Sequence, residues 1–226
     1  MTESSPDFSL AGKRALVTGS SRGIGLAVAS AMAASGAEVV LNGRNTEVLD
    51  TATTSLQAQG LNVSGQGFDV TSEFEVNAAA EAIGEIDILV NNAGIQRRGA
   101  LAEFTFSDWQ EVLSTNLTSA FLVSRAFVNP MINAKAGKII NICSLMSELA
   151  RPTTGPYAAA KGGLKMLTRA MCGEWAKHNI QVNAIGPGYI ETELTAPLIA
   201  DPEFDGWIKS RTPAGRWGKV SDLTGA

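Results

Sequence analysis

The stretch "RALVTGSSRGIG" at residues 14–25 joins a short apolar run to a glycine-rich turn and then to an amphipathic segment. Its glycines follow the spacing G-x-x-x-G-x-G rather than G-x-G-x-x-G. Glycine permits unusual backbone angles, and its missing side chain lets a pyrophosphate approach a helix N-terminus, where backbone N–H groups face the anion. The stretch therefore predicts a strand–turn–helix unit that binds a nucleotide. A tight turn without a ligand is the alternative interpretation.

The same alternation of apolar runs and amphipathic stretches continues along the chain. Unbroken runs of Val, Ile and Leu suit strands that are buried on both faces, as in a parallel sheet. Strands are predicted at 14–19, 37–42, 63–70, 86–92, 138–144 and 180–186, and helices at about 24–35, 45–59, 72–84, 106–128 and 157–178. Strands alternating with helices form βαβ units, so the predicted fold class is α/β, a Rossmann-like doubly wound parallel sheet with helices on both faces. Residues 1–226 are expected to form a single dinucleotide-binding and catalytic domain.

The composition limits the possible partners. The 226 residues are 45% hydrophobic and 18% charged, which is typical of a globular protein. The net charge of −4 argues against a polyanion-binding surface, so no nucleic-acid partner is expected. Apolar runs are shorter than a membrane span, and the N-terminus does not resemble a signal peptide. Cys143 and Cys172 form no CxxC pair and are interpreted as reduced thiols of a cytoplasmic protein.

The count of histidines removes two classes of mechanism. The sequence contains one histidine, His178, between a helical run and a strand-like run. A Ser–His–Asp site would need a nucleophile elbow that the sequence does not show, and a histidine-rich zinc site would lack its ligands. No metal is therefore expected, and His178 is interpreted as a surface residue at a helix end.

The end of the second predicted strand indicates which nucleotide is bound. Its sequence "VVLNGRN" has Gly43 and Arg44 where a dinucleotide-binding fold usually places an acid for the ribose 2′-hydroxyls. An acid would repel a 2′-phosphate, whereas an arginine pairs with one, and Arg22 could add a second positive charge. The sequence thus predicts NADP(H), with NAD(H) less favoured. Solvated surface arginines are the alternative.

Two more strand ends extend the predicted groove. Asp69 in "FDVT" could accept a hydrogen bond from an adenine amino group. The small residues of "NNAG" at 91–94 follow the next strand, where a backbone could lie against a ribose. Because ligands of α/β sheets bind at the carboxyl ends of the strands, these features describe one continuous groove.

Polar residues after the fifth predicted strand suggest proton transfer. Ser144 ends that strand, and Tyr157 and Lys161 follow at i and i+4, one helical turn apart. A tyrosine exchanges a proton near neutral pH only if its pKa falls by about three units, which a nearby ammonium and an oxidised nicotinamide would favour. Asn116 stands inside a predicted helix, where asparagine is unfavourable, and we interpret it as a local bend that holds a water. The alternatives are a packed helix face for the Tyr–Lys pair and an asparagine bonded to a neighbouring strand.

Together, "TGSSRGIG", "NNAG", Asn116, Ser144, "YAAAK" and "NAIGPGYIET" resemble the short-chain dehydrogenase/reductase family over about residues 8–226. The resemblance implies a tetrad of Asn116, Ser144, Tyr157 and Lys161. Tyr157 would be the general acid or base, Ser144 would polarise the substrate oxygen, Lys161 would lower the pKa of Tyr157 and bond the nicotinamide ribose, and Asn116 would hold a relay water. The expected cofactor contacts are Gly19, Ser21, Arg22, Gly23, Ile24, Gly25, Arg44, Asp69, Val70, Asn92, Ala93, Gly94, Tyr157, Lys161, Pro187, Gly188, Ile190 and Thr192.

Within the family, "LVNNAGIQRRG", "NICSLMSELARPT" and "RTPAGRWG" look most like the members that exchange a hydride between NADP(H) and C5 of gluconate or 5-ketogluconate. A carboxylate substrate needs a cation, so Arg97 and Arg151 are expected to contact it together with Ser144, with Arg98 also near the mouth. Exposed rim arginines are the alternative. Rival substrates are a 3-oxoacyl carrier-protein thioester and a ketodeoxy sugar acid. A non-catalytic nucleotide sensor or scaffold is a rival of another class, which the complete tetrad argues against.

The chain ends at "SDLTGA", whereas the family pattern continues through another strand that carries an Asp-Gly-Gly turn. The resemblance implies that this strand extends the sheet and helps form a tetramer interface. The domain is therefore expected to lack the family's last strand, and the expected assembly is a homotetramer or a homodimer.

Overall fold

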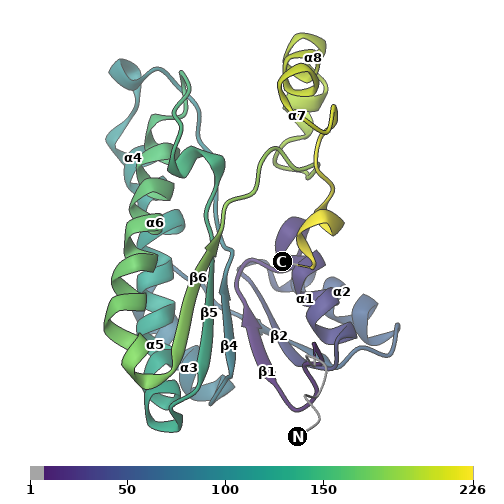
Figure 1. Cartoon of the computed structure of the whole chain (residues 1–226), viewed down its shortest axis with the longest axis vertical. Coiled ribbons are helices and arrows are strands. Elements are labelled where there is room, and N and C mark those ends of the chain that lie inside the picture. Colours follow the sequence, from purple (N-terminus) through teal and green to yellow (C-terminus); the bar gives the residue numbers. More distant parts are fainter. Residues whose placement is uncertain (1–7, 226) are drawn as a thin grey trace, which may run out of the picture.

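The computed structural model describes residues 8–225, which contain a six-stranded sheet in the order β3-β2-β1-β4-β5-β6 (Figure 1). All neighbouring strands pair in parallel. The strands are β1 (Arg14–Val17), β2 (Glu38–Gly43), β3 (Val63–Gly67), β4 (Ile88–Asn91), β5 (Gly137–Ile142) and β6 (Ile180–Ile185). The chain passes from β3 at one edge to β4 beside β1, so the strand order reverses between β1 and β4. This confirms the predicted doubly wound α/β fold.

Several predicted strands end earlier than expected. The third was predicted to reach residue 70, but β3 ends at Gly67. The carboxylate of Asp69 accepts hydrogen bonds from the N–H of Thr71 at 2.8 Å and from its hydroxyl at 2.7 Å. Such a local Asx turn gives the backbone an alternative to strand pairing. The residues predicted to bind ligand therefore lie in loops just beyond the strands.

Helices cover both faces of the sheet (Figure 1). α1 (Gly23–Ala34) and α2 (Thr46–Gln57) lie on one face, and α3 (Glu73–Ile83), α5 (Ser119–Ala134) and α6 (Gly155–Trp175) lie on the other. α7 (Ala196–Ile199) and α8 (Pro202–Arg211) stand beyond the carboxyl end of the sheet, at the top of Figure 1. These last two helices were not predicted. Their segment is short and its apolar residues follow no clear helical period, which explains the omission.

The helix predicted over about 106–128 is present, but it contains a π-helical turn and continues to Ala134. The structure has α4 (Phe106–Leu113), then a π-helical segment at Ser114–Thr118, and then α5. A π-helical turn inserts one extra residue into the helical ladder and bends the axis, often at functional sites. α5 ends where Lys135 adopts a left-handed conformation with φ 50°.

Alternate residues of each strand pack on opposite faces of the sheet. Leu16 of β1 belongs to a core cluster with Phe127 of α5 and Met171 of α6. Its neighbour Val17 belongs to a second cluster with Ala29 of α1. The period of two along a strand therefore fills two separate cores, which explains why the strands are apolar throughout.

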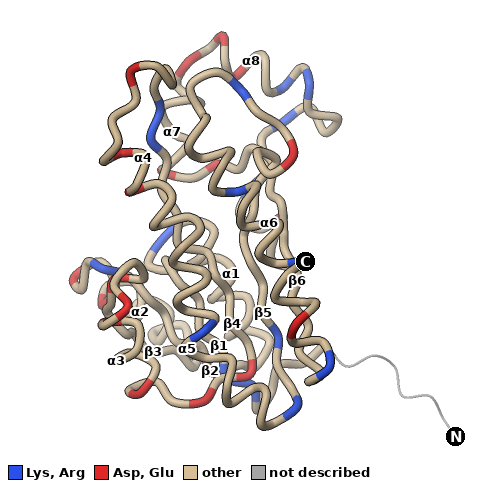
Figure 2. The backbone as a smooth tube through the Cα atoms, turned by 90° about the vertical axis from the view of Figure 1, so that its left-hand side faces the viewer, with Lys and Arg blue, Asp and Glu red and all other residues tan. Residues whose placement is uncertain are grey.

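Charged residues of both signs are interspersed over the molecule (Figure 2). Among the described residues, no helix is long and apolar enough to cross a membrane. Within the same part of the chain, no group of three or more His, Cys, Asp or Glu side chains could hold a metal ion.

Two phenylalanines provide a matched test of this core. Phe127 is 2% exposed, whereas Phe74 on α3 is 83% exposed. We expect Phe127→Ala to lower the free energy of unfolding by about 3–5 kcal/mol, because a large buried side chain leaves a cavity. Phe74→Ala should change it by less than about 0.5 kcal/mol. Urea unfolding followed by circular dichroism measures both, and equal losses would contradict the assigned core.

Candidate active site

A cleft of about 630 Å³ lies at the carboxyl ends of the strands. Its volume is in the range of small-molecule and cofactor sites. The loops after all six strands contribute to it, so residues far apart in the sequence meet at one edge of the sheet. Its lining includes the four predicted tetrad residues and every predicted cofactor residue except Gly25. The lining residues that were not predicted as site residues are Asn42, Gly43, Phe68, Ile95, Thr115, Ile142, Cys143, Glu193, Leu194 and Thr195.

The glycine-rich turn forms an anion cradle at the start of α1. Gly19 and Gly23 have φ of 61° and 57°, a region that glycine adopts without strain. Arg22 occupies the N-cap position without a side-chain capping bond, and the first turn of α1 contains no acid. The N–H groups of that turn and the helix dipole thus favour a phosphate group. These residues fit the pyrophosphate of a dinucleotide.

Gly25 has a packing role in this cradle. A Cβ atom at Gly25 would lie 2.4 Å from Nδ2 of Asn92 and 2.5 Å from the carbonyl oxygen of Gly19. Because that space is taken, α1 can approach the loop after β4 only with glycine at this position. This packing accounts for its absence from the lining.

Two asparagines at the carboxyl ends of β2 and β4, the strands on either side of β1, hold the turn in place. Asn42 accepts a hydrogen bond from the N–H of Gly19 at 3.1 Å and donates to the carbonyl oxygen of Phe68 at 3.0 Å. Asn92 donates to the carbonyl oxygens of Thr18 and Gly19 at 2.9 and 3.0 Å. Sequence reasoning missed Asn42, although an asparagine inside the apolar run "VVLN" is a usable signal.

A basic corner lies where β2 ends. Gly43 and Arg44 both line the cleft, and a guanidinium nitrogen of Arg44 lies 3.5 Å from a carboxylate oxygen of Asp69. Burial raises the pKa of Asp69, but hydrogen bonds from Thr71 and the charge of Arg44 outweigh it, so its pKa lies below the usual value. Asp69 is therefore ionised at neutral pH and holds Arg44 at the cleft.

Ser144, Tyr157 and Lys161 meet at the other end of the cleft. Ser144 follows β5 and accepts a hydrogen bond from the N–H of Met146 at 3.1 Å. Tyr157 and Lys161 belong to the first two turns of α6. Burial raises the pKa of Tyr157, and a hydrogen bond with Ser144 partly opposes this effect. Tyr157 is therefore protonated at neutral pH and is suited to donate a proton.

Lys161 is almost fully buried, with 3% of its surface exposed. Its Nζ donates a hydrogen bond to the carbonyl oxygen of Ile142 at 2.6 Å and lies 5.8 Å from the centre of the Tyr157 ring. Burial lowers the pKa of Lys161 to about 8. The expected lowering of the Tyr157 pKa by Lys161 is not among the causes of the shift at Tyr157, where burial dominates.

Asn116 lies in the π-helical segment and is 1% exposed. Its Nδ2 donates to the carbonyl oxygens of Ile95 and Val112 at 3.0 and 2.9 Å, and its Oδ1 accepts from the N–H of Ile95 at 3.2 Å. Its side chain thus joins the bent helix to the loop after β4, which agrees with the alternative interpretation of a structural asparagine. The relay water stays a prediction.

The arginines predicted at the substrate do not line this cleft. Arg97 is exposed and forms hydrogen bonds with Glu111 at 3.0 and 3.2 Å. Arg98 and Arg151 also lie outside the lining and are close enough to each other for their charges to interact. Cys143 lines the cleft, and burial raises the pKa of its thiol, which keeps it protonated.

Known proteins match this chain over nearly its whole length. A family model described as short chain dehydrogenase matches residues 13–203. The gluconate 5-dehydrogenase of Gluconobacter oxydans (strain 621H) is 54% identical over 228 residues, covering 99% of this chain and 89% of that protein. The 2-dehydro-3-deoxy-D-gluconate 5-dehydrogenase of Formosa agariphila is 50% identical over 225 residues, covering 97% of this chain and 85% of that protein. The crystal structure of a gluconate 5-dehydrogenase from Burkholderia cenocepacia J2315 in complex with NADP and tartrate is 49% identical with a TM-score of 0.93, covering 97% and 88%.

The buried ammonium of Lys161 predicts how stability depends on pH. Between its folded pKa of about 8 and its unfolded pKa of 10.5, the unfolded chain binds a proton that the folded chain does not. Stability therefore rises with pH in this window. Relative to Lys161→Met, the wild type should gain up to about 3 kcal/mol between pH 7 and pH 10.5. Chemical unfolding of both proteins across this range measures the difference, and a difference independent of pH would show that the ammonium is not destabilised by burial.

Proposed function

The chain belongs to the short-chain dehydrogenase family, and on that premise we propose that it transfers a hydride between NADP(H) and C5 of a sugar acid. The observation that carries the proposal is the meeting of Ser144, Tyr157 and Lys161 at one end of a cleft. The other end holds an anion cradle and Arg44. The named activities of the relatives from Gluconobacter oxydans and Formosa agariphila support oxidoreduction at C5 of a sugar acid.

In this proposal, NADPH supplies the hydride from nicotinamide C4 to the carbonyl carbon. Ser144 donates a hydrogen bond to the carbonyl oxygen and orients it. Tyr157 gives its phenolic proton to that oxygen as negative charge develops. Burial favours the protonated phenol, which is the form that reduction requires. In the oxidation direction the same group must accept a proton, so positive charge nearby is needed.

Lys161 is the group of this chain that supplies such charge. At pH values below about 8 it is an ammonium, and its Nζ lies 5.8 Å from the centre of the Tyr157 ring. Its hydrogen bond to the carbonyl oxygen of Ile142 fixes its position. Asn116 would complete the tetrad by holding the helix bend against the loop after β4, with a water between its segment and Lys161.

Further proposals concern the protein as a whole. We propose one domain that combines cofactor binding and catalysis, because a single cleft contains both sets of residues. We propose a homotetramer or homodimer from the family resemblance. A cytoplasmic location is supported by Cys143 and Cys172, which form no disulfide in the described chain.

A ketodeoxy sugar acid is a second candidate substrate, favoured by the name of the Formosa agariphila relative. A carrier-protein thioester would need a basic docking surface, and the interspersed charges in Figure 2 give it less support. A sensor without turnover would not require Ser144 and Tyr157 to share a hydrogen bond at the cleft.

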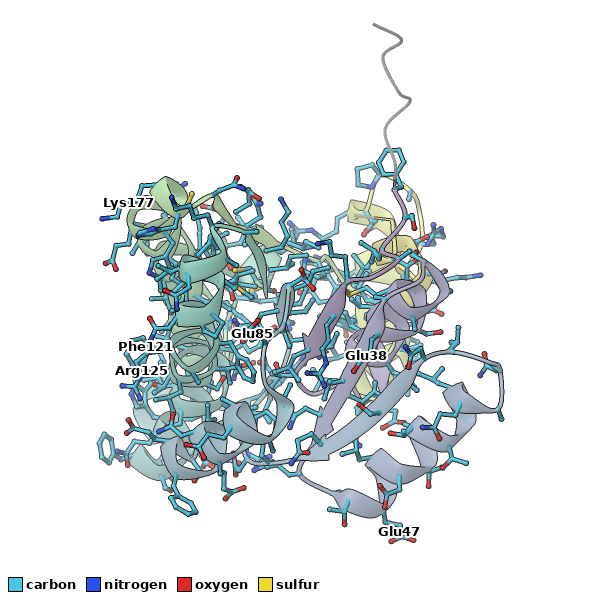
Figure 3. The ribbon with its side chains drawn as sticks, turned by 90° about the horizontal axis from the view of Figure 1, so that it is seen from below. Glu38, Glu47, Glu85, Phe121, Arg125 and Lys177 are labelled. Atoms are coloured by element: carbon cyan, nitrogen blue, oxygen red, sulfur yellow. The ribbon has the colours of Figure 1, made fainter. Side chains whose placement is uncertain are left out.

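The choice of cofactor depends on Arg44 in this proposal. We expect Arg44→Met to raise the KM for NADPH by about 10- to 100-fold, because a charge-assisted pair with the 2′-phosphate is lost. The KM for NADH should change little. Arg125→Met is the matched control, because Arg125 lies on α5 beside Phe121, at the outside of the molecule (Figure 3), and pairs with Glu73. Equal losses with both cofactors would contradict a role in 2′-phosphate binding.

The reaction itself is tested with D-gluconate plus NADP⁺ or NAD⁺, and with 5-ketogluconate plus NADPH or NADH. We expect turnover that favours NADP(H), and a loss of at least about 100-fold in kcat for Tyr157→Phe, which removes one hydroxyl group. Absorbance at the nicotinamide band measures both. No turnover of either sugar acid would refute the substrate, and a fully active Tyr157→Phe would refute the proton transfer.

A further inference from the structure

Buried polar atoms without hydrogen-bond partners occur beside the catalytic end of the cleft. Among the described residues, Nε of Arg151, the hydroxyl oxygen of Tyr189 and Oε1 of Gln96 are buried and have no partner. Such groups cost free energy, so each one needs a physical explanation. The Arg151 guanidinium lies 6.0 Å from the centre of the Tyr189 ring, and Arg98, two residues after Gln96, is close enough to Arg151 for their positive charges to interact.

These residues are not part of the cleft lining, but they lie next to residues that are. Tyr189 stands between Gly188 and Ile190, which both line the cleft, and Gln96 follows the lining residue Ile95. Two backbone hydrogen bonds join the segments: the N–H of Leu145 donates to Pro187 at 3.1 Å, and the N–H of Gly99 donates to Thr153 at 3.3 Å. The loops after β4, β5 and β6 therefore meet beside Ser144, at one end of the cleft.

The guanidinium of Arg151 lies against two aromatic rings. Its Cζ atom lies 4.7 Å from the centre of the Phe204 ring of α8, and Phe204 packs edge-on against Tyr189 at 5.8 Å. The carbonyl oxygen of Arg151 accepts hydrogen bonds from the N–H and hydroxyl of Thr154 at 3.3 and 2.8 Å. A guanidinium stacked on an aromatic ring keeps its donors in the ring-parallel plane, where a carboxylate can bind.

The turn that carries Arg151 is strained. Thr153 has φ of 68°, a left-handed conformation that a β-branched residue rarely adopts. Strain of this kind persists where the surrounding structure imposes it, and it is concentrated at ligand sites. Here it places Arg151 against Phe204 and Tyr189.

The local charge calls for an anion. Arg98 is exposed, but partial loss of hydration and then the positive charge of Arg151 lower the pKa of its guanidinium. Within the described chain, ten ion pairs join Lys or Arg to carboxylates, and neither Arg98 nor Arg151 is in any of them. Two unpaired guanidinium groups beside each other are stabilised when a carboxylate binds between them.

We propose that Arg151, together with Tyr189 and Arg98, binds the carboxylate of the substrate, and that Gln96 accepts a hydrogen bond from a substrate hydroxyl group. Arg151 therefore determines specificity for sugar acids over neutral sugars. This inference rests on the proposed function, which supplies a substrate with both groups. Arg151 was already expected to contact the substrate from the sequence. Arg98 takes the role expected of Arg97, because the guanidinium of Arg97 pairs with Glu111.

The test compares D-gluconate with D-glucitol, a neutral polyol of the same length. Calorimetric titration of the NADP⁺ complex measures both affinities, and kinetics with 5-ketogluconate and NADPH measure KM and kcat. We expect Arg151→Met to weaken D-gluconate binding and to raise the KM for 5-ketogluconate by about 10- to 100-fold. D-glucitol binding and the KM for NADPH should stay within about 3-fold, since the lost group acts on the carboxylate. Arg151→Lys should give a smaller loss, because an ammonium keeps the charge without the planar fork.

Arg211→Met is the matched control. Arg211 also lies over an aromatic ring, with its Cζ 4.4 Å from the centre of the Trp207 ring, but it belongs to α8 itself and not to the loops that adjoin the cleft. If this variant loses D-gluconate affinity as Arg151→Met does, lost packing of α8 explains the effect and the inference is wrong.

The remaining outcomes separate this inference from the proposed function. If the wild type reduces 5-ketogluconate and Arg151→Met does so with an unchanged KM, the carboxylate site alone is wrong. If the wild type neither oxidises D-gluconate nor reduces 5-ketogluconate, the proposed function fails. Even without turnover, D-gluconate binding that is lost in Arg151→Met would support the carboxylate site. If the wild type does not bind D-gluconate at all, the carboxylate site is wrong as well.

Discussion

The close approach of the turn after β1 to the loop after β4 is the constraint on which the site depends. A Cβ atom at Gly19 would lie 2.9 Å from Cα of Ala93, and one at Gly25 would lie 2.4 Å from Nδ2 of Asn92. Two missing side chains therefore let the backbones meet at the point where the strand order reverses. Asn92 then bonds the carbonyl oxygens of the turn, so the anion cradle and the floor of the cleft form one rigid unit.

The catalytic end is built at a cost in stability. Lys161 is buried with a single hydrogen bond to a backbone carbonyl, and this burial lowers its pKa to about 8. A nearby carboxylate would relieve the cost, but it would also cancel the positive charge that the proposed transfer of a proton to Tyr157 needs. The free-energy cost of burying the Lys161 ammonium is therefore only partly offset. Perturbed groups of this kind are typical of active sites, where charge is positioned for the reaction rather than for folding.

Much of the fold followed from the sequence because the strands are buried on both faces. Their apolar runs are unbroken, and the polar residues that end them stand out by contrast, as Ser144 does after "NIC". The sequence suggested the pair of Tyr157 and Lys161 because they are four residues apart on one helix. By contrast, α8 and the partners of Arg97 depend on contacts between segments with no local signal. No spacing in the sequence indicates that Arg97 pairs with Glu111 or that Arg151 lies against the Phe204 ring.

The segment that was hardest to predict has a large influence on the substrate end. Phe204 and Trp217 pack against Tyr189, and the indole N–H of Trp217 donates to Asp205 at 2.8 Å. This aromatic cluster joins α8 to the loop after β6, so the orientation of Arg151 depends on residues some fifty positions away. A cofactor common to many enzymes needs only the short motifs at the strand ends. Recognition of one substrate needs contacts that the loops of a particular chain bring together, which is why sequence motifs identify the chemistry before they identify the substrate.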